Sequence, residues 1–242
     1  MTKNKHRLEE KVALITGASR GIGLAIAHAL AAERCNLVIS ARRLSTLDQA
    51  AKRLAKFRVR VLPVACDVRE EEAVAAMMAA VKKDFRRLDI LINNAGMANK
   101  SLTVEQLPVE AWREAIDTNL TGTFLVTKAA LPLMKRGGVI LNNLSVAARM
   151  AFPNMAAYVA SKHGALGLTK TLREELRPKG IRVMALLLGA VDTDIWDAFW
   201  QDAPRKTMIR PETVARAVVD ALRLPEDSSV DELVITRAAG AV

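Results

Sequence analysis

The sequence Thr16-Gly17-Ala18-Ser19-Arg20-Gly21-Ile22-Gly23 joins an apolar run at residues 12–15 to a helical pattern that begins at Leu24. Three glycines alone are a weak signal, but a strand before them and a helix after them make the pattern specific. Such glycines permit a tight turn and close backbone approach, and the helix N-terminus then faces a pyrophosphate. The alternative is a strand-to-helix turn whose glycines only serve packing. We expect a dinucleotide site here, formed by Gly17, Ser19, Arg20, Gly21, Ile22 and Gly23.

Six further short apolar runs follow, at residues 37–40, 59–65, 90–92, 139–141, 183–188 and 233–235, with helical stretches between them. The runs are rich in Val, Ile and Leu with little alternation, which is typical of parallel strands covered by helices on both faces. No Pro/Gly/Ser-rich linker interrupts the series. We therefore expect one doubly wound, Rossmann-type α/β domain over residues 1–242, with a predominantly parallel seven-stranded sheet and helices on both faces. Residues 1–9 are expected to form a flexible N-terminal segment.

Composition excludes several other classes of protein. Apolar residues make up 51% of the 242 residues and charged residues 26%, which suits a globular domain with a sizeable core. No apolar run reaches the ~18–20 residues that span a bilayer, and the charged N-terminus lacks the features of a signal peptide. Cys35 and Cys66 are not at metal-binding spacing and are interpreted as reduced, buried thiols. A cytoplasmic protein with no membrane partner and no metal is expected.

The net charge is +10, from 36 Lys and Arg against 26 Asp and Glu. A nucleic-acid binder would concentrate this charge on one element with interleaved aromatic residues. Here the basic residues are spread along the chain and aromatic residues are only 4%. We therefore expect no nucleic-acid partner, but a surface that attracts small molecules carrying phosphate.

The end of the second predicted strand indicates which dinucleotide binds. Sites of the NAD type have an acidic residue ~20 positions beyond the glycines, where it holds a ribose hydroxyl. This chain instead reads Ser40-Ala41-Arg42-Arg43, without a carboxylate. Arginine makes forked, charge-assisted hydrogen bonds to phosphate, so Arg42 and Arg43, with Arg20, suit a ribose that carries an extra phosphate. The alternative is a pair of solvated arginines at a helix start. The predicted cofactor is NADPH/NADP.

The chain has a single tyrosine, and Tyr158 precedes Lys162 by four residues. Residues at this spacing share one face of a helix, so the phenol and the ammonium lie side by side. A nearby cation favours the phenolate and lowers its pKa from ~10, which would provide an acid/base at cellular pH. By itself the spacing is also compatible with a half-buried ring beside a solvated charge.

Taken together, the motifs make the chain resemble a short-chain dehydrogenase/reductase of the compact, single-domain, NADP-preferring branch, from about residue 10 to the C-terminus. Besides the glycine stretch and the Tyr158/Lys162 pair, the matching positions follow the predicted strands in order. They are Asp67-Val68 after the third run, Asn93-Asn94-Ala95-Gly96 after the fourth, Asn119 in the next helical region and Ser145 after the fifth. In this order and spacing the set is highly specific.

The resemblance implies a role for each matching residue. Tyr158 is expected to be the general acid/base and Ser145 to hydrogen-bond the substrate carbonyl. Lys162 is expected to lower the pKa of Tyr158 and bind the nicotinamide ribose, while Asn119 holds a water that links Lys162 to solvent. The remaining implied cofactor contacts are Asp67 at the adenine, with Val68, Asn94, Ala95 and Gly96 along the cleft.

The chain departs from the family pattern after the sixth predicted strand. The family usually has an Asn-Pro-Gly turn there, whereas this chain reads Leu187-Leu188-Gly189-Ala190-Val191-Asp192-Thr193. Gly189, Val191 and Thr193 still match the positions that hold the nicotinamide. Because no proline fixes φ, we expect a looser turn and a less constrained nicotinamide ring.

The segment after this turn bears on the substrate. Trp196, Phe199 and Trp200 stand at i, i+3 and i+4, as in an amphipathic helix over the cleft. With Met97, Val146, Met150 and Phe152, they indicate an apolar substrate lid. The alternative is packing of that helix on the domain or on a partner subunit. Carrier-protein reductases of the family commonly end in a glycine-rich strand and tail that this chain lacks, so a carrier-protein substrate is not assigned.

The predicted function is an NADPH-dependent carbonyl reductase, reversibly an alcohol dehydrogenase. Hydride passes from the nicotinamide to a ketone, an aldehyde or a 3-oxoacyl substrate, with tyrosine as the general acid. The alternative function is a catalytically weak NADP(H)-binding sensor or regulatory protein. By resemblance a homo-oligomer, dimer or tetramer, is expected to pair through the helices after the fourth and fifth strands.

Overall fold

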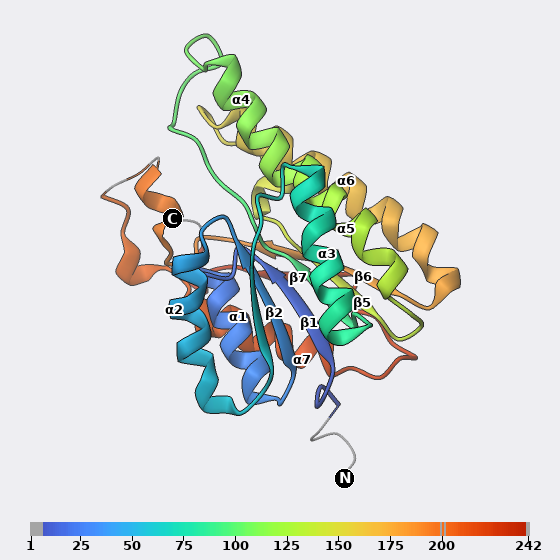
Figure 1. Ribbon diagram of the computed structural model, residues 1–242. Helices are drawn as coiled ribbons and strands as arrows, with labels where there is room; N and C mark the ends of the chain where they lie inside the picture. The colour runs from blue at the N-terminus through green and yellow to red at the C-terminus, as the bar shows by residue number, and fades with distance from the viewer. Residues whose placement is uncertain (1–6, 199, 201, 241–242) are drawn as a thin grey trace.

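The computed structural model describes residues 7–198, 200 and 202–240, and seven parallel strands form its centre (Figure 1). The strand order is β3-β2-β1-β4-β5-β6-β7. The strands are β1 (Val12–Thr16), β2 (Asn36–Ala41), β3 (Val61–Ala65), β4 (Ile90–Asn93), β5 (Val139–Asn143), β6 (Arg182–Leu188) and β7 (Glu232–Ile235). Each begins and ends within two residues of its predicted run, and the predicted fold class is confirmed.

Burial explains why these runs form strands of this kind. Every residue of β1 is buried, and β2, β5 and β6 have buried centres, because helices cover both faces of the sheet. β3 lies at one edge, next to β2 only, and contains Pro63. Proline lacks the backbone N–H that a ladder hydrogen bond needs, so it fits in an edge strand, where that position can face away from the sheet.

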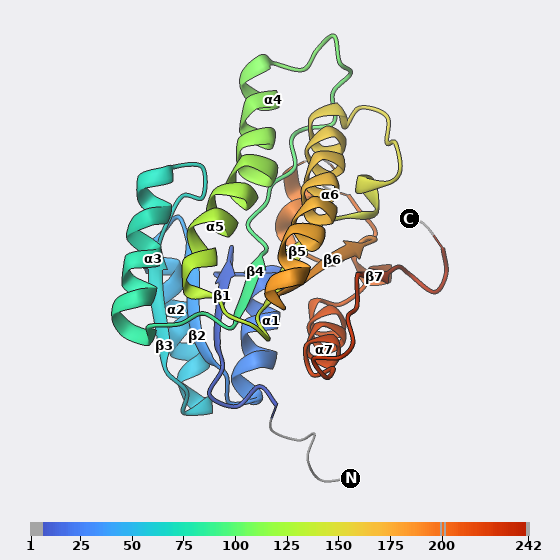
Figure 2. The same cartoon turned by 90° about the vertical axis from the view of Figure 1, so that its right-hand side faces the viewer.

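Two layers of helices enclose the sheet (Figure 2). One core cluster joins the sheet to α1, α2 and α7, and α1 and α7 contact each other. The opposite cluster joins the sheet to α3, α5 and α6, while α4 extends beyond the end of the sheet (Figures 1 and 2). The helices are α1 (Gly21–Ala32), α2 (Leu44–Leu54), α3 (Glu71–Phe85), α4 (Val109–Ile116), α5 (Gly122–Ala130), α6 (Ala156–Leu176) and α7 (Pro211–Leu222).

The N-terminal segment lies mostly outside the described residues, which start at residue 7. Of the segment expected to be flexible, Leu8 is buried in the core, and Glu9 forms an ion pair with Arg34 at 2.8 Å. None of the described helices is both long and apolar enough to cross a membrane.

The strand order reverses between β1 and β4, and this is where the fold opens. Chain crossovers leave from β1 toward β2 on one side and from β4 toward β5 on the other, which separates the loops at the carboxyl ends of the strands. A cavity of about 1160 Å³ lies there. This exceeds the ~300–1,000 Å³ of a typical small-molecule site, so the cavity has room for more than one ligand.

Candidate active site

The cavity collects nearly all of the predicted site residues, although they span more than 170 positions of the chain. Two predicted residues, Gly23 and Asn119, do not line it. The predicted residues that do are Gly17, Ser19, Arg20, Gly21, Ile22, Arg42, Arg43, Asp67, Val68, Asn94, Ala95, Gly96, Ser145, Tyr158, Lys162, Gly189, Val191 and Thr193. We refer below to two parts of the cavity. The arginine half contains Arg20, Arg42, Arg43 and Arg53, and the tyrosine half contains Ser145, Tyr158 and Lys162.

Two of the glycines are required by close packing. Gly17 has φ +64°, and a Cβ there would lie 2.9 Å from the Cα of Ala95. A Cβ on Gly23 would lie 2.4 Å from Nδ2 of Asn94 and 2.5 Å from the carbonyl oxygen of Gly17. Gly23 therefore closes the turn from behind and does not face the cavity, while the turn itself presents bare backbone to a ligand.

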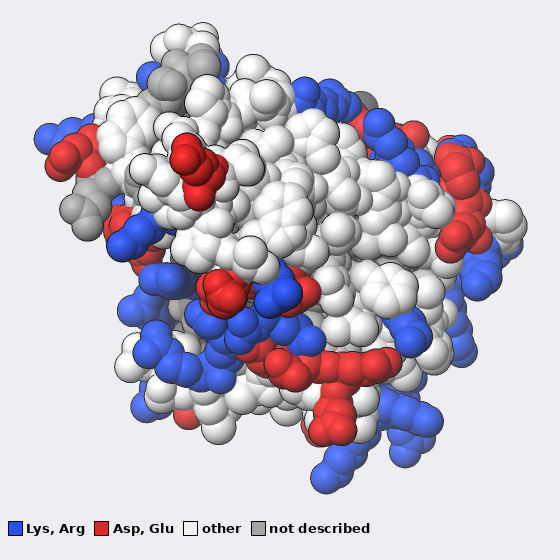
Figure 3. Space-filling view, turned by 90° about the horizontal axis from the view of Figure 1, so that it is seen from above, with Lys and Arg blue, Asp and Glu red and all other residues white. Residues whose placement is uncertain are grey.

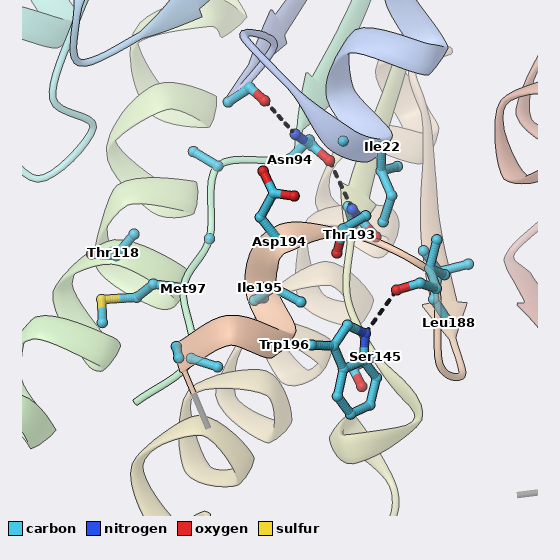
Figure 4. Close-up of a pocket in the computed structure, with 18 of the residues that line it drawn as sticks. Ile22, Asn94, Met97, Thr118, Ser145, Leu188, Thr193, Asp194, Ile195 and Trp196 are labelled. Carbon is cyan, nitrogen blue, oxygen red and sulfur yellow. Dashed lines mark hydrogen bonds between the residues drawn. The ribbon is translucent and has the colours of Figure 1, made fainter. Parts of the chain in front are cut away.

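Asn94 fixes the glycine turn to the end of β4 (Figure 4). Its Nδ2 donates to the carbonyl oxygens of Thr16 at 2.9 Å and Gly17 at 3.1 Å. In return, Oγ1 of Thr16 accepts the backbone N–H groups of Asn94 at 3.0 Å and Ala95 at 2.9 Å. Thr16 is not among the predicted site residues. Its position as the last polar residue of β1 is the signal that could have identified it.

The arginine half is strongly basic and open to solvent. Arg20 is 72% exposed, and its Nη1 lies 3.0 Å from Oδ2 of Asp194. Arg53, on α2, was not predicted and adds a fourth guanidinium. Seen from above, basic side chains lie around much of the rim, with a dense group at the lower left, whereas much of the middle of the face is uncharged (Figure 3). This half offers several cations to an anionic ligand.

Asp67 is held by an arginine that the sequence did not single out. The guanidinium of Arg69 donates to both oxygens of Asp67, from Nε at 3.0 and 3.1 Å and from Nη2 at 2.6 Å. Hydrogen bonds from Arg69 hold the pKa of Asp67 below its usual range, against the effect of burial. Asp67 is therefore an oriented carboxylate at the wall of the cavity.

Asn119 lies behind the cavity, in a π-helical turn, η2 (Asp117–Thr121), that joins α4 to α5. Its Oδ1 accepts the N–H of Met97 at 2.9 Å, and its Nδ2 donates to Met97 O at 3.0 Å and Ser161 Oγ at 2.9 Å. The amide thus ties the loop after β4 to α6. A Cβ on Gly96 would lie 3.3 Å from Oδ1 of Asn119 and 3.7 Å from Nζ of Lys162, so the glycine lets both side chains approach. The implied water-holding role stays a prediction.

The tyrosine half combines β5 and α6. Ser145 follows β5, and its Oγ accepts the N–H of Ala147 at 3.1 Å. Tyr158 and Lys162 lie on α6 four positions apart, and Nζ of Lys162 is 5.6 Å from the centroid of the phenol ring. A hydrogen bond also connects the Tyr158 phenol to Ser145. Hydroxyl, phenol and ammonium groups therefore meet in one wall of the cavity.

The pKa values in this half differ from the expectation. Burial raises the pKa of Tyr158, and the hydrogen bond with Ser145 opposes this only in part. Burial also lowers the pKa of Lys162 to about 8. The pKa of Tyr158 is therefore raised overall in this structure and not lowered as predicted. The ammonium donates to the carbonyl oxygen of Asn143 at 3.1 Å, and burial dominates the effect of the charge.

The turn after β6 is well fixed although it lacks the proline. The N–H of Gly189 donates to Ile235 O at 2.9 Å, which attaches the turn to β7. On the other side, Ala190 O accepts the N–H of Ile209 at 3.0 Å, and the N–H of Asp192 donates to Ile209 O at 2.8 Å. Backbone hydrogen bonds thus constrain the turn where the proline is missing, and the expected loosening stays a prediction.

The segment beyond this turn forms part of the cavity wall (Figure 4). It is a 3₁₀ turn, Asp194–Ala198, and not the expected α-helix; Phe199 is outside the described residues. Trp196 donates from Nε1 to Val191 O at 2.8 Å and packs edge-on against Trp200, with ring centroids 6.0 Å apart. The segment thus packs on the domain and also lines the cavity, while its role as a substrate lid stays a prediction. Its apolar companions there are Met97, Val146, Met150 and Phe152.

One arginine anchors this segment. Arg205 donates to Asp192 at 2.5 Å and to Asp197 at 2.9 Å, and its Nη2 lies 3.7 Å from Asp194. Asp194 thus stands between Arg205 and Arg20. Within the part of the chain that the structure describes, no group of three His, Cys, Asp or Glu side chains could hold a metal ion.

Comparison with known proteins identifies the family. The model of the short chain dehydrogenase family matches residues 11–204, and the chain belongs to this family. Trans-4-hydroxycyclohexanecarboxylate dehydrogenase of Sinomonas cyclohexanicum is 42% identical over 200 residues, covering 80% of this chain and 77% of that protein. An alcohol dehydrogenase structure from the archaeon Thermococcus sibiricus, complexed with 5-hydroxy-NADP, has a TM-score of 0.90 at 34% identity, covering 97% and 99% of the two chains.

A second solved structure shows the range of cofactors among these relatives. The 3-ketoacyl-(acyl-carrier-protein) reductase of Brucella melitensis, complexed with NADH, has a TM-score of 0.85 at 31% identity, covering 95% of this chain and 98% of that one. The protein is accordingly an NAD(P)-dependent oxidoreductase that acts on CH–OH or C=O groups. Its residues fit the cofactor, since the glycine turn leaves backbone exposed beside four arginines.

Proposed function

We propose that the protein is an NADPH-dependent carbonyl reductase, reversibly an alcohol dehydrogenase, for small or medium apolar ketones, aldehydes or 3-oxoacyl compounds. One observation carries this proposal. Ser145, Tyr158 and Lys162 line the same cavity as the four arginines and a set of apolar side chains. Dinucleotide, reacting carbonyl and apolar substrate would therefore meet at the only phenol of the chain.

The chemistry follows from the groups present. The nicotinamide cofactor supplies the hydride, and the protein must place a proton on the oxygen that becomes an alkoxide. Tyr158 is protonated at neutral pH, since its pKa is raised, so its phenol can donate that proton. Ser145 Oγ stabilises the oxygen as charge develops on it. Lys162, with a pKa of about 8, carries a charge at pH 7 that stabilises the remaining phenolate.

The preference for NADPH rests on the arginine half. No carboxylate follows Ala41 at the end of β2; Arg42 and Arg43 stand there, with Arg20 and Arg53 on the same wall. A carboxylate would repel a phosphate on the adenosine ribose, whereas guanidinium groups bind it. The relatives include complexes with a phosphorylated and with an unphosphorylated dinucleotide, so these local charges carry the assignment.

A panel of carbonyl compounds tests the activity. Alicyclic and open-chain ketones, aldehydes and 3-oxoacyl thioesters would be offered with NADPH, and oxidation followed by absorbance. We expect turnover on the apolar members, with NADH much less effective. Binding of NADPH without turnover on any member would instead support the nucleotide-binding sensor.

We also propose that the protein is a homo-oligomer, a dimer or tetramer. Three large apolar side chains are exposed on α4 and α5: Val109 at 56%, Trp112 at 39% and Phe124 at 45%. A neighbouring copy would cover them, as a monomer in water leaves such side chains solvated. Light scattering at working concentration should give a multiple of the chain mass, and a 26.3 kDa particle would refute this part of the proposal.

A further inference from the structure

Asn143 ends β5, two residues before Ser145, and makes two connections within the tyrosine half. Its backbone carbonyl accepts the Lys162 ammonium at 3.1 Å, and its side-chain Nδ2 donates to Oδ1 of Asn94 at 2.8 Å. Among the residues that the structure describes, this carbonyl is the one hydrogen-bond acceptor of that ammonium. Asn143 therefore links the lysine on α6 to the residue that holds the glycine turn.

The orientation of the Asn143 amide follows from its neighbour. Both hydrogens of Asn94 Nδ2 are used, on the carbonyl oxygens of Thr16 and Gly17. The side chain of Asn94 must then point its Oδ1 toward Asn143, and the NH₂ group of Asn143 must be the donor to it. The Oδ1 of Asn143 is left buried, and no donor among the described residues reaches it.

A buried amide oxygen without a donor is unfavourable, so such an atom is usually satisfied by water or by a ligand. Asn143 lines the cavity beside Ser145 and Lys162. A dinucleotide that extends from the glycine turn to Tyr158 brings amide and hydroxyl donors to this part of the cavity. These are the carboxamide of the nicotinamide and the hydroxyls of its ribose.

We propose that Asn143 is a positioning residue. Its side chain locks Asn94 onto the glycine turn, its carbonyl holds the Lys162 ammonium, and its Oδ1 accepts a hydrogen bond from the nicotinamide half of the dinucleotide. The inference rests on the proposed cofactor. It adds a residue that binds the nicotinamide half directly. The same residue also contacts Lys162 and, through Asn94, the glycine turn.

The test compares whole and partial cofactors by calorimetry. The probes are NADP, 2′-phospho-ADP-ribose, which lacks only the nicotinamide, and adenosine 2′,5′-bisphosphate, which lacks the entire nicotinamide half. Asn143→Leu should weaken NADP roughly 3- to 10-fold, the effect of losing one neutral hydrogen bond. Binding of the bisphosphate should fall by a smaller factor, because this probe does not reach Asn143 and is affected only by the lost link from Asn143 to Asn94 at the glycine turn. An equal loss with 2′-phospho-ADP-ribose assigns the donor to the ribose, and no loss assigns it to the carboxamide.

The chain offers a matched control in Asn99. This residue also donates one hydrogen bond, to Ala111 O at 2.9 Å, has a buried Oδ1 without a donor among the described residues, and lies outside the large cavity. Asn99→Leu should therefore lose comparable stability while binding all three probes as the wild type does. If Asn143→Leu does not fold, Asn143→Ser carries the same comparison with a smaller side chain.

Two results would overturn the inference. One is an Asn143 variant that weakens NADP and the bisphosphate by the same factor, which would mean general damage to the cavity. The other is NADP binding unchanged from the wild type. If the wild type itself binds none of the three probes, the proposed cofactor fails, and the inference fails with it.

Discussion

The two halves of the cavity hold their charged groups in opposite ways. In the arginine half, Arg20 is 72% exposed and its partner Asp194 is 49% exposed. In the tyrosine half, Lys162 is 7% exposed and donates to a backbone carbonyl, and behind it Asn119 is 2% exposed with its amide hydrogen-bonded at both ends. The difference indicates that the two halves have different roles in ligand binding and in catalysis. Solvated charges select a ligand by sign, whereas buried hydrogen bonds fix the positions on which proton transfer depends.

The largest expected effect comes from the tyrosine half. Tyr158→Phe removes one oxygen and nearly preserves shape, so folding and NADPH binding should survive. General acid catalysis typically contributes 10²–10⁴-fold, and turnover on any accepted carbonyl should fall by at least about 100-fold. Steady-state rates would be compared with NADPH titrations by fluorescence. Turnover within tenfold of the wild type would remove Tyr158 from the proton transfer and weaken the contrast between the halves.

The arginine half should respond in binding and not in chemistry. Losing one charged hydrogen bond to phosphate through Arg42→Ala should weaken NADPH roughly 10- to 100-fold while NADH changes little. Lys52→Ala is the control, because Lys52 is an exposed cation on α2, the helix that follows Arg42, but does not line the cavity. Equal losses for both cofactors would show that Arg42 does not recognise the extra phosphate.

The buried ammonium predicts a pH dependence of stability in the cofactor-free protein. The pKa of Lys162 is about 8 in the folded state and ~10.4 in the unfolded state. Between these values the unfolded state binds more protons, so the free energy of unfolding gains up to ~1.4 kcal/mol per pH unit from this group. From pH 8 to 10 the wild type should gain roughly 2–3 kcal/mol relative to Lys162→Met.

Urea unfolding at pH 7.5 and pH 10, followed by tryptophan fluorescence, measures this difference. The comparison between variants cancels the opposite contribution of Cys35 and Cys66, whose pKa values burial raises to about 12 and about 11. A pH-independent difference between the two proteins would mean that Lys162 is not desolvated. The halves would then be less different than the structure shows.

The smallest effect is expected where a solvated charge meets the substrate segment. Asp194 competes with phosphate for Arg20, so Asp194→Asn should tighten NADPH only about two- to fivefold, as an exposed ion pair contributes up to ~1 kcal/mol. Asp197→Asn is the control on the same turn, since Asp197 pairs with Arg205 at 2.9 Å. Weaker NADPH binding in Asp194→Asn would instead mean that Asp194 orients Arg20.

The fold was predictable because its signals are local. Each strand is a short run of Val, Ile and Leu, and the glycine turn is bounded by a strand and a helix within a few residues of sequence. The exception is the segment at residues 194–198, where spacing predicted an α-helix. Trp196, within this segment, donates to Val191 O, and Arg205, after it, donates to Asp192. These contacts hold a 3₁₀ turn in place of a continuous helix.

The sequence predicted which residues form the site, but not the hydrogen bonds that join them. Asn143 and Asn94 are 49 positions apart, and Asn94 and Thr16 are 78 apart, so no spacing rule joins them. The prediction of a lowered pKa for Tyr158 is wrong for a related reason. Helical spacing places Lys162 near the phenol, but only the packed structure shows that burial raises the pKa and that the ammonium faces Asn143.

The orientation of Asn119 depends on the number of residues in the π turn at residues 117–121. A π turn contains one residue more than an α turn, and each helical residue rotates the chain by ~100°. Deleting Thr118 would allow regular α-helical hydrogen bonding from α4 into α5 and would turn Asn119 out of phase with Met97 and Ser161. The chain could thus lose the connection between the loop after β4 and α6 by shortening a helix by one residue, with every residue of the tyrosine half unchanged.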